Sequence, residues 1–173
     1  IQAEVGETFI QVKELLDKGE KVFICSNPCQ IFALKKYLRK KYPNLYTCDI
    51  LCKGVPTYKF LKAYLDYQSS KYGSEVKSLH FKFKDEKYVW GHLGTKIEFE
   101  NGKCYLKDGG EDAFMTAFLK TGFTVRPSCI ECHFKDFPRY ADISLGDFWG
   151  IQNYSKQDTR KGMSLVLVNN EKG

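Results

Sequence analysis

The pattern of apolar and polar positions predicts that helices and strands alternate in the N-terminal part of the chain. Apolar residues recur with helical spacing over 6–18 and again over 29–41, which indicates two amphipathic helices. Short apolar runs over 22–25 and 45–51 indicate buried strands, and a third helix is expected over 56–67. Because helix and strand alternate, we predict an α/β section in which the strands are parallel.

The rest of the chain predicts an antiparallel section. Residues 76–84 alternate between polar and apolar side chains, as in a half-buried strand. Two further strand-like segments flank Asn101-Gly102, a dipeptide that favours a tight hairpin turn. A helix over 113–119 and a last strand over 164–168 follow. The predicted fold class is therefore mixed α/β (α+β): a parallel-strand α/β section followed by an antiparallel hairpin section, in one compact domain.

Composition and charge limit the class of protein and its cellular compartment, but they do not identify a function. The 173 residues suffice for one domain with a core, and no apolar run is long enough to span a bilayer. An odd number of cysteines, seven, argues against a secreted disulfide scaffold and favours a reducing cytoplasm. The net charge of +6 comes mainly from lysines on predicted helices. These lysines indicate either a solvated face or a surface for an acidic partner, a phosphorylated cofactor or nucleic acid.

Four of the cysteines fall on predicted turns that contain proline or glycine. Cys29 and Cys52 each follow a predicted strand and precede a helix. If these strands are adjacent and parallel, both thiols lie at the edge of the sheet where α/β proteins place their ligands. Cys129 and Cys132 form a C-x-x-C later in the chain. Four thiolates from three loops suit an iron–sulfur cluster or a zinc ion.

The other three cysteines are expected to be packing residues. Cys25, Cys48 and Cys104 lie within predicted strands and have apolar or aromatic neighbours, so we interpret them as small core side chains. His133 directly follows Cys132 and is an alternative metal ligand.

The turn after the first predicted strand has the features of an anion site. Ser26 or Asn27 can cap the helix that begins near Pro28, and the free N–H groups of its first turn point beyond Cys29. Such a helix start stabilises a phosphate or a negatively charged cluster. A plain helix cap with a small apolar cysteine explains the same residues. Lys53, next to Cys52, could supply further positive charge.

The segment 146–150 places an acid and two aromatic residues between two glycines at the end of a predicted strand. A planar ring system could stack on Trp149 while Asp147 binds a ring nitrogen or a ribose hydroxyl. In the alternative interpretation, the segment is a turn whose aromatic side chains seal the core.

Four motifs carry a resemblance to a known family. They are Asn27-Pro28-Cys29-Gln30, Leu51-Cys52-Lys53-Gly54-Val55-Pro56, Pro127-Ser128-Cys129-Ile130-Glu131-Cys132 and Ala141-Asp142-Ile143-Ser144-Leu145-Gly146-Asp147-Phe148-Trp149-Gly150. On these motifs, which occur in the family's order and cover nearly the whole chain, the sequence resembles the beta-subunit family of coenzyme F420 hydrogenases and dehydrogenases. Members of this family are iron–sulfur flavoproteins that pass electrons between clusters, a bound flavin and a substrate.

The resemblance implies an electron-transfer oxidoreductase module with a [4Fe-4S] cluster and FAD. Coenzyme F420 or a similar soluble coenzyme is the implied electron acceptor. The implied metal ligands are Cys29, Cys52, Cys129 and Cys132. The implied cofactor contacts are Ser26, Asn27, Gln30, Lys53, Asp147 and Trp149. No catalytic residue is assigned.

Two departures from the family pattern affect these expectations. Lys53 stands where the motif usually has histidine, so a role of that histidine does not carry over. Related chains usually continue N-terminally with a flavin-contacting segment and often a ferredoxin-like cluster domain. We therefore expect 1–173 to be a single domain from a longer chain. A ferredoxin-like domain or another redox subunit is the expected partner, and nucleic acid is not.

A zinc-stabilised binding module, with a basic face that contacts an acidic protein or nucleic acid, is the competing interpretation. The strand-end positions of Cys29 and Cys52 favour the redox interpretation. Structural zinc sites more often use two close C-x-x-C pairs, and this chain has one. A relative that keeps the fold without the cluster is a third possibility.

Overall fold

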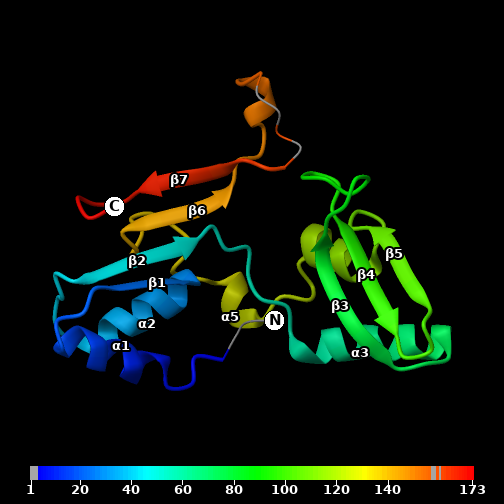
Figure 1. Ribbon diagram of the computed structural model, residues 1–173, viewed down its shortest axis with the longest axis horizontal. Coiled ribbons are helices and arrows are strands. Elements are labelled where there is room, and N and C mark those ends of the chain that lie inside the picture. The colour runs from blue at the N-terminus through cyan, green and yellow to red at the C-terminus, as the bar shows by residue number, and fades with distance from the viewer. Residues whose placement is uncertain (1–3, 157–158, 160) are drawn as a thin grey trace. The chain divides into compact units, whose positions relative to one another are not determined.

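The computed structural model describes residues 4–156, 159 and 161–173, which divide into two compact units. Among the described residues, the parallel-sheet unit comprises 4–53 together with Glu131–Trp149 and Ser164–Gly173. The antiparallel unit comprises Gly54–Ile130 and Gly150–Met163. Both are shown in Figure 1. No helix within the described residues has the length and apolar character needed to cross a membrane.

The parallel-sheet unit has a four-stranded sheet in the order β1-β2-β6-β7. Strands β1, β2 and β6 are parallel to one another, and β7 is antiparallel to β6. Its elements are α1 (Thr8–Asp17), β1 (Val22–Ser26), α2 (Pro28–Leu38), β2 (Leu45–Ile50), β6 (Ile143–Asp147) and β7 (Ser164–Val168). The predicted parallel direction of the first two strands is therefore confirmed, and the two strands are adjacent.

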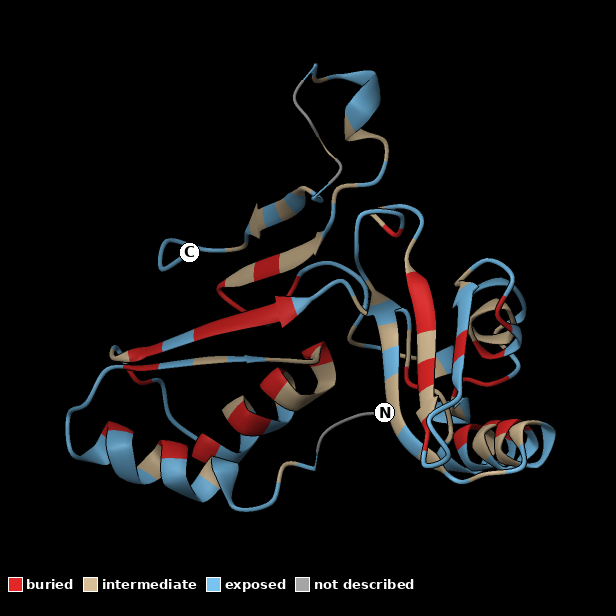
Figure 2. Cartoon of the chain, turned by 45° about the vertical axis from the view of Figure 1, so that its right-hand side comes forward, coloured by how far each residue is buried: buried red, intermediate tan, exposed pale blue. Residues whose placement is uncertain are grey.

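The core of this unit lies where helices α1 and α2 pack on one face of strands β1 and β2 (Figures 1 and 2). Burying such aliphatic side chains stabilises the unit by about 1.5–3 kcal/mol each. The apolar helical stripes predicted from the sequence supply most of this cluster. Its buried members are Val12, Leu16, Val22, Leu34, Leu38, Tyr42 and Leu45.

The opposite face of the sheet is much more exposed, and this corrects one prediction. Phe23 and Cys25 alternate with the core-facing residues of β1 and are both exposed. The expectation that Cys25 is a core residue is therefore wrong, because α1 and α2 cover the other face. Cys48, its register partner on β2, is fully buried as predicted.

The antiparallel unit has a three-stranded sheet in the order β3-β4-β5. Its elements are α3 (Tyr58–Tyr72), β3 (Val76–Phe83), β4 (Gly94–Phe99), β5 (Cys104–Asp108), α4 (Ala113–Thr116), the π-helical turn η1 (Ala117–Thr121), α5 (Pro127–Ile130) and the 3-10 turn η2 (Ile151–Asn153). The hairpin at Asn101-Gly102 is confirmed, with Gly102 at φ +78° in the turn between β4 and β5. Cys104 begins an edge strand and is exposed, so its predicted core position is also wrong.

Several predicted helix ends shift for local reasons. Helix α2 stops at Leu38 because Arg39 adopts a left-handed conformation with φ 58°. Helix α3 starts at Tyr58, where the Thr57 side chain accepts the N–H of Phe60, and it continues five residues beyond the predicted end. The predicted helix over 113–119 is split into α4 and η1. The mixed α/β class, with a parallel section before an antiparallel one, is confirmed. A single domain over 1–173 remains a prediction.

A buried carboxylate organises the core of the antiparallel unit. Asp112 is fully buried, and its Oδ2 accepts hydrogen bonds from the hydroxyl groups of Tyr64 (2.6 Å) and Tyr105 (2.8 Å). Its Oδ1 caps α4 by accepting the N–H of Met115 at 2.9 Å. Burial, together with these bonds to Asp112, raises the pKa of Tyr64 and Tyr105. The two tyrosines therefore remain protonated donors at neutral pH.

We expect the Tyr64→Phe variant to lose about 1.5–2 kcal/mol of unfolding free energy, because Asp112 keeps its burial but loses one donor to a charged acceptor. Urea unfolding followed by circular dichroism measures this change. Tyr67→Phe on the same helix is the control, since Tyr67 is 60% exposed. Equal effects of the two substitutions would contradict the role assigned to Asp112.

Candidate functional site

Most of the predicted site residues lie at the carboxyl ends of the parallel strands β1, β2 and β6. Cys29 lies in the first turn of α2, just after β1, and Cys52 follows β2 by two residues. Asp147 is the last residue of β6, and Trp149 lies two residues beyond it. Since β1, β2 and β6 run parallel, their carboxyl ends share an edge, and this is where α/β proteins bind ligands.

The turn between β1 and α2 differs in detail from the predicted cap. Asn27 occupies the cap position, but only its backbone carbonyl acts there, accepting the N–H groups of Gln30 (2.9 Å) and Ile31 (3.0 Å). Its side chain makes no capping hydrogen bond. The Ser26 hydroxyl donates instead to Oε1 of Gln30. Pro28 is the first helical residue, as predicted, so the helix start is fixed without either side chain as a cap.

An aromatic cluster holds the Cys132 loop against helix α2. Phe32, one turn beyond Cys29, packs on Phe134 with ring centroids 4.9 Å apart and on Tyr140 at 4.7 Å. Residues three apart share a helix face, and Phe134 is only two residues from Cys132. The contacts therefore attach the segment that carries Cys132 to the first turns of α2.

Arg139 joins that same loop to the strand end that precedes Cys52. Its Nη1 donates to the carbonyl of Lys135 at 2.9 Å, and its Nη2 donates to the carbonyl of Ile50, also at 2.9 Å. Lys135 lies three residues after Cys132, and Ile50 lies two residues before Cys52. One buried guanidinium thus fixes the segments that carry two of the predicted metal ligands.

The guanidinium is balanced by a buried polar network. Asp49 Oδ1 accepts from Arg139 Nη2 at 2.8 Å, and both side chains have no exposed surface. The Ser144 hydroxyl accepts from Arg139 Nε at 3.2 Å, donates to Asp49, and is held by the Asn169 side chain at 3.0 Å. The second carboxylate oxygen of Asp49 has no hydrogen-bond partner within the described residues.

Sequence reasoning missed this network, although one signal was present. Asp49 is a charged residue inside an otherwise apolar strand, and such a residue needs a buried partner of opposite charge. Its partner, Arg139, lies 90 positions later in an irregular, proline-containing loop, so nothing local identifies it.

Cys129 belongs to the antiparallel unit, where it lies on the one-turn helix α5. Segment 54–57 pairs with the chain before α5 through the N–H of Thr57 and the carbonyl of Thr124 (2.8 Å). Gly54 has φ +124°, and a Cβ added there would lie 2.6 Å from Val125 Cγ1 and 3.2 Å from Cys129 Cβ. Only glycine fits this approach, and it stands two residues after Cys52 in the chain.

The four predicted ligands are all partly buried thiols, which suits metal ligation in chemical type and accessibility. The structure connects the segments of Cys29, Cys52 and Cys132 within one unit, but it does not assemble a ligand set. Among the described residues, no three His, Cys, Asp or Glu side chains converge closely enough to share a metal ion. The metal-ligand assignments therefore remain predictions.

In the Gly-Asp-Phe-Trp-Gly segment, the tryptophan side chain does not cover the core. Trp149 is 61% exposed, so the alternative in which its ring seals the core is wrong for this residue. Asp147 is also exposed, and Phe148 is half-buried. An exposed indole and an exposed carboxylate therefore lie two residues apart at this end of β6.

Burial distinguishes Cys48 from the other six cysteines. Burial, reinforced by the neighbouring Cys25 thiol, raises the pKa of Cys48 to about 12. Because the thiolate is the nucleophile, we expect iodoacetamide at pH 8 to alkylate exposed Cys25 at least about a hundredfold faster than Cys48. Time-resolved peptide mass spectrometry measures both rates, and comparable rates would contradict the burial of Cys48.

Comparison with known proteins agrees with the motifs. Residues 19–173 match the family described as the C terminus of the beta subunit of coenzyme F420 hydrogenase/dehydrogenase. No curated protein matches the chain. The match includes the three cysteine motifs, the motif at 141–150 and the residues of the Arg139–Asp49 network. The chain therefore belongs to the coenzyme F420 hydrogenase/dehydrogenase beta-subunit family.

Proposed function

We propose that the chain is an electron-transfer module of an iron–sulfur flavoprotein oxidoreductase. In this proposal a [4Fe-4S] cluster passes electrons to FAD, and the flavin passes them to coenzyme F420 or a similar soluble acceptor. Family membership supports a redox role of the hydrogenase beta-subunit kind. The observation that carries the finer proposal is the attachment of the Cys29, Cys52 and Cys132 segments to one another by the Phe32 cluster and Arg139.

In this function the thiolates of Cys29, Cys52, Cys129 and Cys132 would hold the cluster. A bound cluster supplies single-electron transfer, and a flavin links it to two-electron chemistry. The N–H groups at the start of α2 favour a negatively charged group beyond Cys29. Arg139 sets the positions of the Cys52 and Cys132 segments, as a support of the kind that orients metal ligands.

The flavin would use the other predicted contacts at the same edge. The exposed Trp149 ring offers a stacking surface, and the Asp147 carboxylate can accept a hydrogen bond from a ring N–H or a hydroxyl. Ser26 ends β1, Asn27 and Gln30 lie at the start of α2, and Lys53 follows β2, where a pyrophosphate would meet backbone N–H groups and one ammonium. A ferredoxin-like domain or another redox subunit would exchange electrons with the cluster.

Anaerobic purification followed by visible spectroscopy and by iron, sulfide, zinc and flavin analysis tests this proposal. We expect broad absorbance around 400 nm, with about four iron and four sulfide per chain. Zinc without colour would replace the proposal with the zinc-stabilised binding module. A colourless, metal-free protein after anaerobic reconstitution with iron and sulfide would leave a family member without the cluster.

A further inference from the structure

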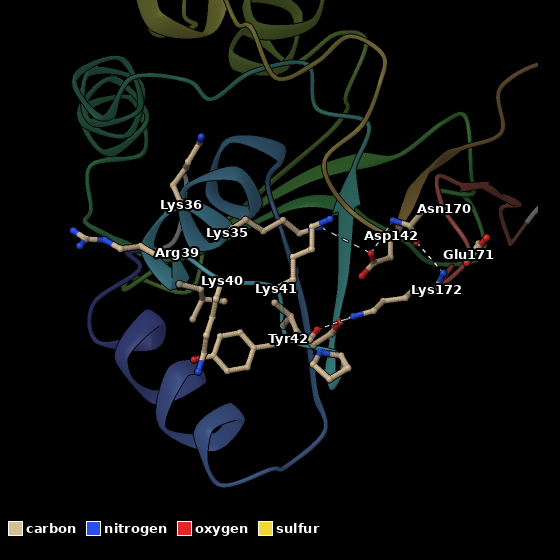
Figure 3. Close-up of a pocket in the computed structure, with 13 residues that line it drawn as sticks. Lys35, Lys36, Arg39, Lys40, Lys41, Tyr42, Asp142, Asn170, Glu171 and Lys172 are labelled. Atoms are coloured by element: carbon tan, nitrogen blue, oxygen red, sulfur yellow. Dashed lines mark hydrogen bonds and ion pairs between the residues drawn. The ribbon is translucent and has the colours of Figure 1, made fainter.

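A basic hollow lies on the parallel-sheet unit, and none of the predicted metal ligands or cofactor contacts lines it. It has a volume of about 1080 Å³ and is formed by the end of α2, the loop that leads into β2, and the segments before β6 and after β7 (Figure 3). The residues that line it are Lys35, Lys36, Leu38, Arg39, Lys40, Lys41, Tyr42, Pro43, Leu45, Asp142, Asn170, Glu171 and Lys172. We call this surface the basic hollow.

The topology places the basic hollow at the opposite end of the parallel strands from Cys29 and Cys52. Leu38 ends α2, Leu45 begins β2, Asp142 directly precedes β6, and Asn170 follows antiparallel β7. These positions are at the amino ends of the parallel strands, whereas Cys29, Cys52 and Asp147 are at the carboxyl ends. The hollow is therefore a separate feature of the unit.

Several lining residues are fixed by hydrogen bonds, so the shape of the hollow is built into the fold. Asp142 accepts the N–H and hydroxyl of Thr47 at 2.6 and 2.8 Å and the side chain of Asn170 at 2.9 Å. The Lys172 ammonium donates to the carbonyls of Tyr42 (2.8 Å) and Leu45 (2.9 Å). These bonds tie the segment after β7 to the loop before β2.

Positive charge dominates the hollow. Six of its lining residues are cationic and two are carboxylates. Burial alone would raise the pKa of Asp142, but the hydrogen bonds from Asn170 and Thr47 and the charge of Lys35 outweigh it and lower this pKa. Asp142 therefore counts as a full negative charge, and an excess of positive charge remains. That excess is large in a chain whose whole net charge is +6.

The cations divide into those that support the fold and those that are available to a ligand. Lys35 donates to the Tyr140 carbonyl at 2.5 Å, and Lys40 lies 3.3 Å from Asp17. Lys41 has no hydrogen bond or ion pair with any described residue. In Figure 3 the Lys35 and Lys41 side chains extend toward Asp142, whereas Lys36 and Arg39 point away from it. The Lys41 ammonium is thus available to bind a ligand in the basic hollow.

We propose that the basic hollow binds a small molecule that carries two or more phosphate groups. Each phosphate group contributes about −1.5 to −2 at neutral pH, a charge opposite in sign to the excess on the lining residues. Lysine ammonium groups bind phosphate as point charges on flexible stems. A concave site of this size fits a small ligand.

Two other polyanions fit the hollow less well. Single-stranded nucleic acid needs exposed aromatic rings on which bases stack, but Tyr42 is only 8% exposed and its ring is covered by the Lys40 ammonium at 4.5 Å. An acidic protein surface would need a broad, flat area with apolar anchors, whereas the apolar lining residues Leu38 and Leu45 are buried in the core.

Isothermal titration calorimetry of the 173-residue chain with inorganic pyrophosphate tests the proposal. We expect saturable one-site binding that weakens as salt is raised, and Lys41→Gln should weaken it about fivefold through loss of one charged contact. Lys18→Gln is the matched control, since Lys18 is an exposed lysine of the same unit that does not line the hollow. This variant should bind pyrophosphate as the parent does.

Three outcomes would overturn the proposal. They are no saturable binding near physiological salt, equal loss in Lys41→Gln and Lys18→Gln, and tighter binding of a hexaglutamate peptide than of pyrophosphate. The last outcome would point to an acidic protein segment instead. Because the hollow lies at the opposite end of the parallel strands, the cluster-free protein should bind equally well, so this test does not depend on the redox proposal.

Discussion

Replacing Arg139 by methionine should lower the free energy of unfolding by about 3–5 kcal/mol, since the substitution leaves Asp49 as a buried, unpaired carboxylate. Both side chains of the pair have no exposed surface, and the second oxygen of Asp49 already lacks a partner among the described residues. The carbonyls of Ile50 and Lys135 also lose their donors. Urea unfolding at neutral pH, followed by circular dichroism, measures the change.

The control for charge and size is Arg39→Met. Arg39 is exposed at the end of α2, so its replacement should change stability by less than about 0.5 kcal/mol. A double variant, Asp49→Leu with Arg139→Met, should recover part of the loss, because it removes both charges together. If Arg139→Met were no more destabilising than Arg39→Met, the buried pair would not stabilise the fold.

The same variant tests Arg139 as a positioning residue. Loss of its two carbonyl contacts should loosen the segments of Cys52 and Cys132, so both thiols should react faster with iodoacetamide in the metal-free protein, while Cys104 should not. A uniform increase at all cysteines would indicate general unfolding. Unchanged rates at Cys52 and Cys132 would contradict the positioning role.

Elements with local signals were predictable from the sequence. The helical stripes of α1 and α2, the Asn101-Gly102 turn and strand β7 depend on residues close together in the chain, and each occurs where it was expected. Helix ends were less accurate, because a single backbone conformation, such as the left-handed Arg39, decides them.

Features that depend on contacts between segments distant in the sequence were not predictable. Cys25 and Cys48 both lie within predicted strands, yet Cys25 is exposed and Cys48 is buried, because the helices cover only one sheet face and burial of the other face is uneven. The Asp49–Arg139 pair joins residues from β2 and a distant loop. The basic hollow is formed by three segments that are distant in the sequence. Only one of them, the lysine-rich segment near the end of α2, is noticeable in the sequence itself.

The second large effect concerns the metal. Cys52→Ala and Cys132→Ala should each lower the iron and sulfide bound after anaerobic reconstitution by more than about tenfold, because a cluster that needs four thiolates loses one. Cys25→Ala and Cys104→Ala are matched controls, since both thiols are exposed and neither belongs to a predicted ligand motif. Iron and sulfide assays, with electron paramagnetic resonance of the dithionite-reduced protein, measure the result.

The control variants make this experiment decisive about the ligand set. If Cys25→Ala lost as much iron as Cys52→Ala, the exposed face of the sheet would take part and the predicted ligands would be wrong. If Cys132→Ala alone kept its cluster, His133, the next residue, would be the candidate replacement, and His133→Ala in that background should then remove the metal. Loss of iron in Cys52→Ala and Cys132→Ala, but not in the two controls, would support a cluster held by the segments that Arg139 and the Phe32 cluster attach to one another.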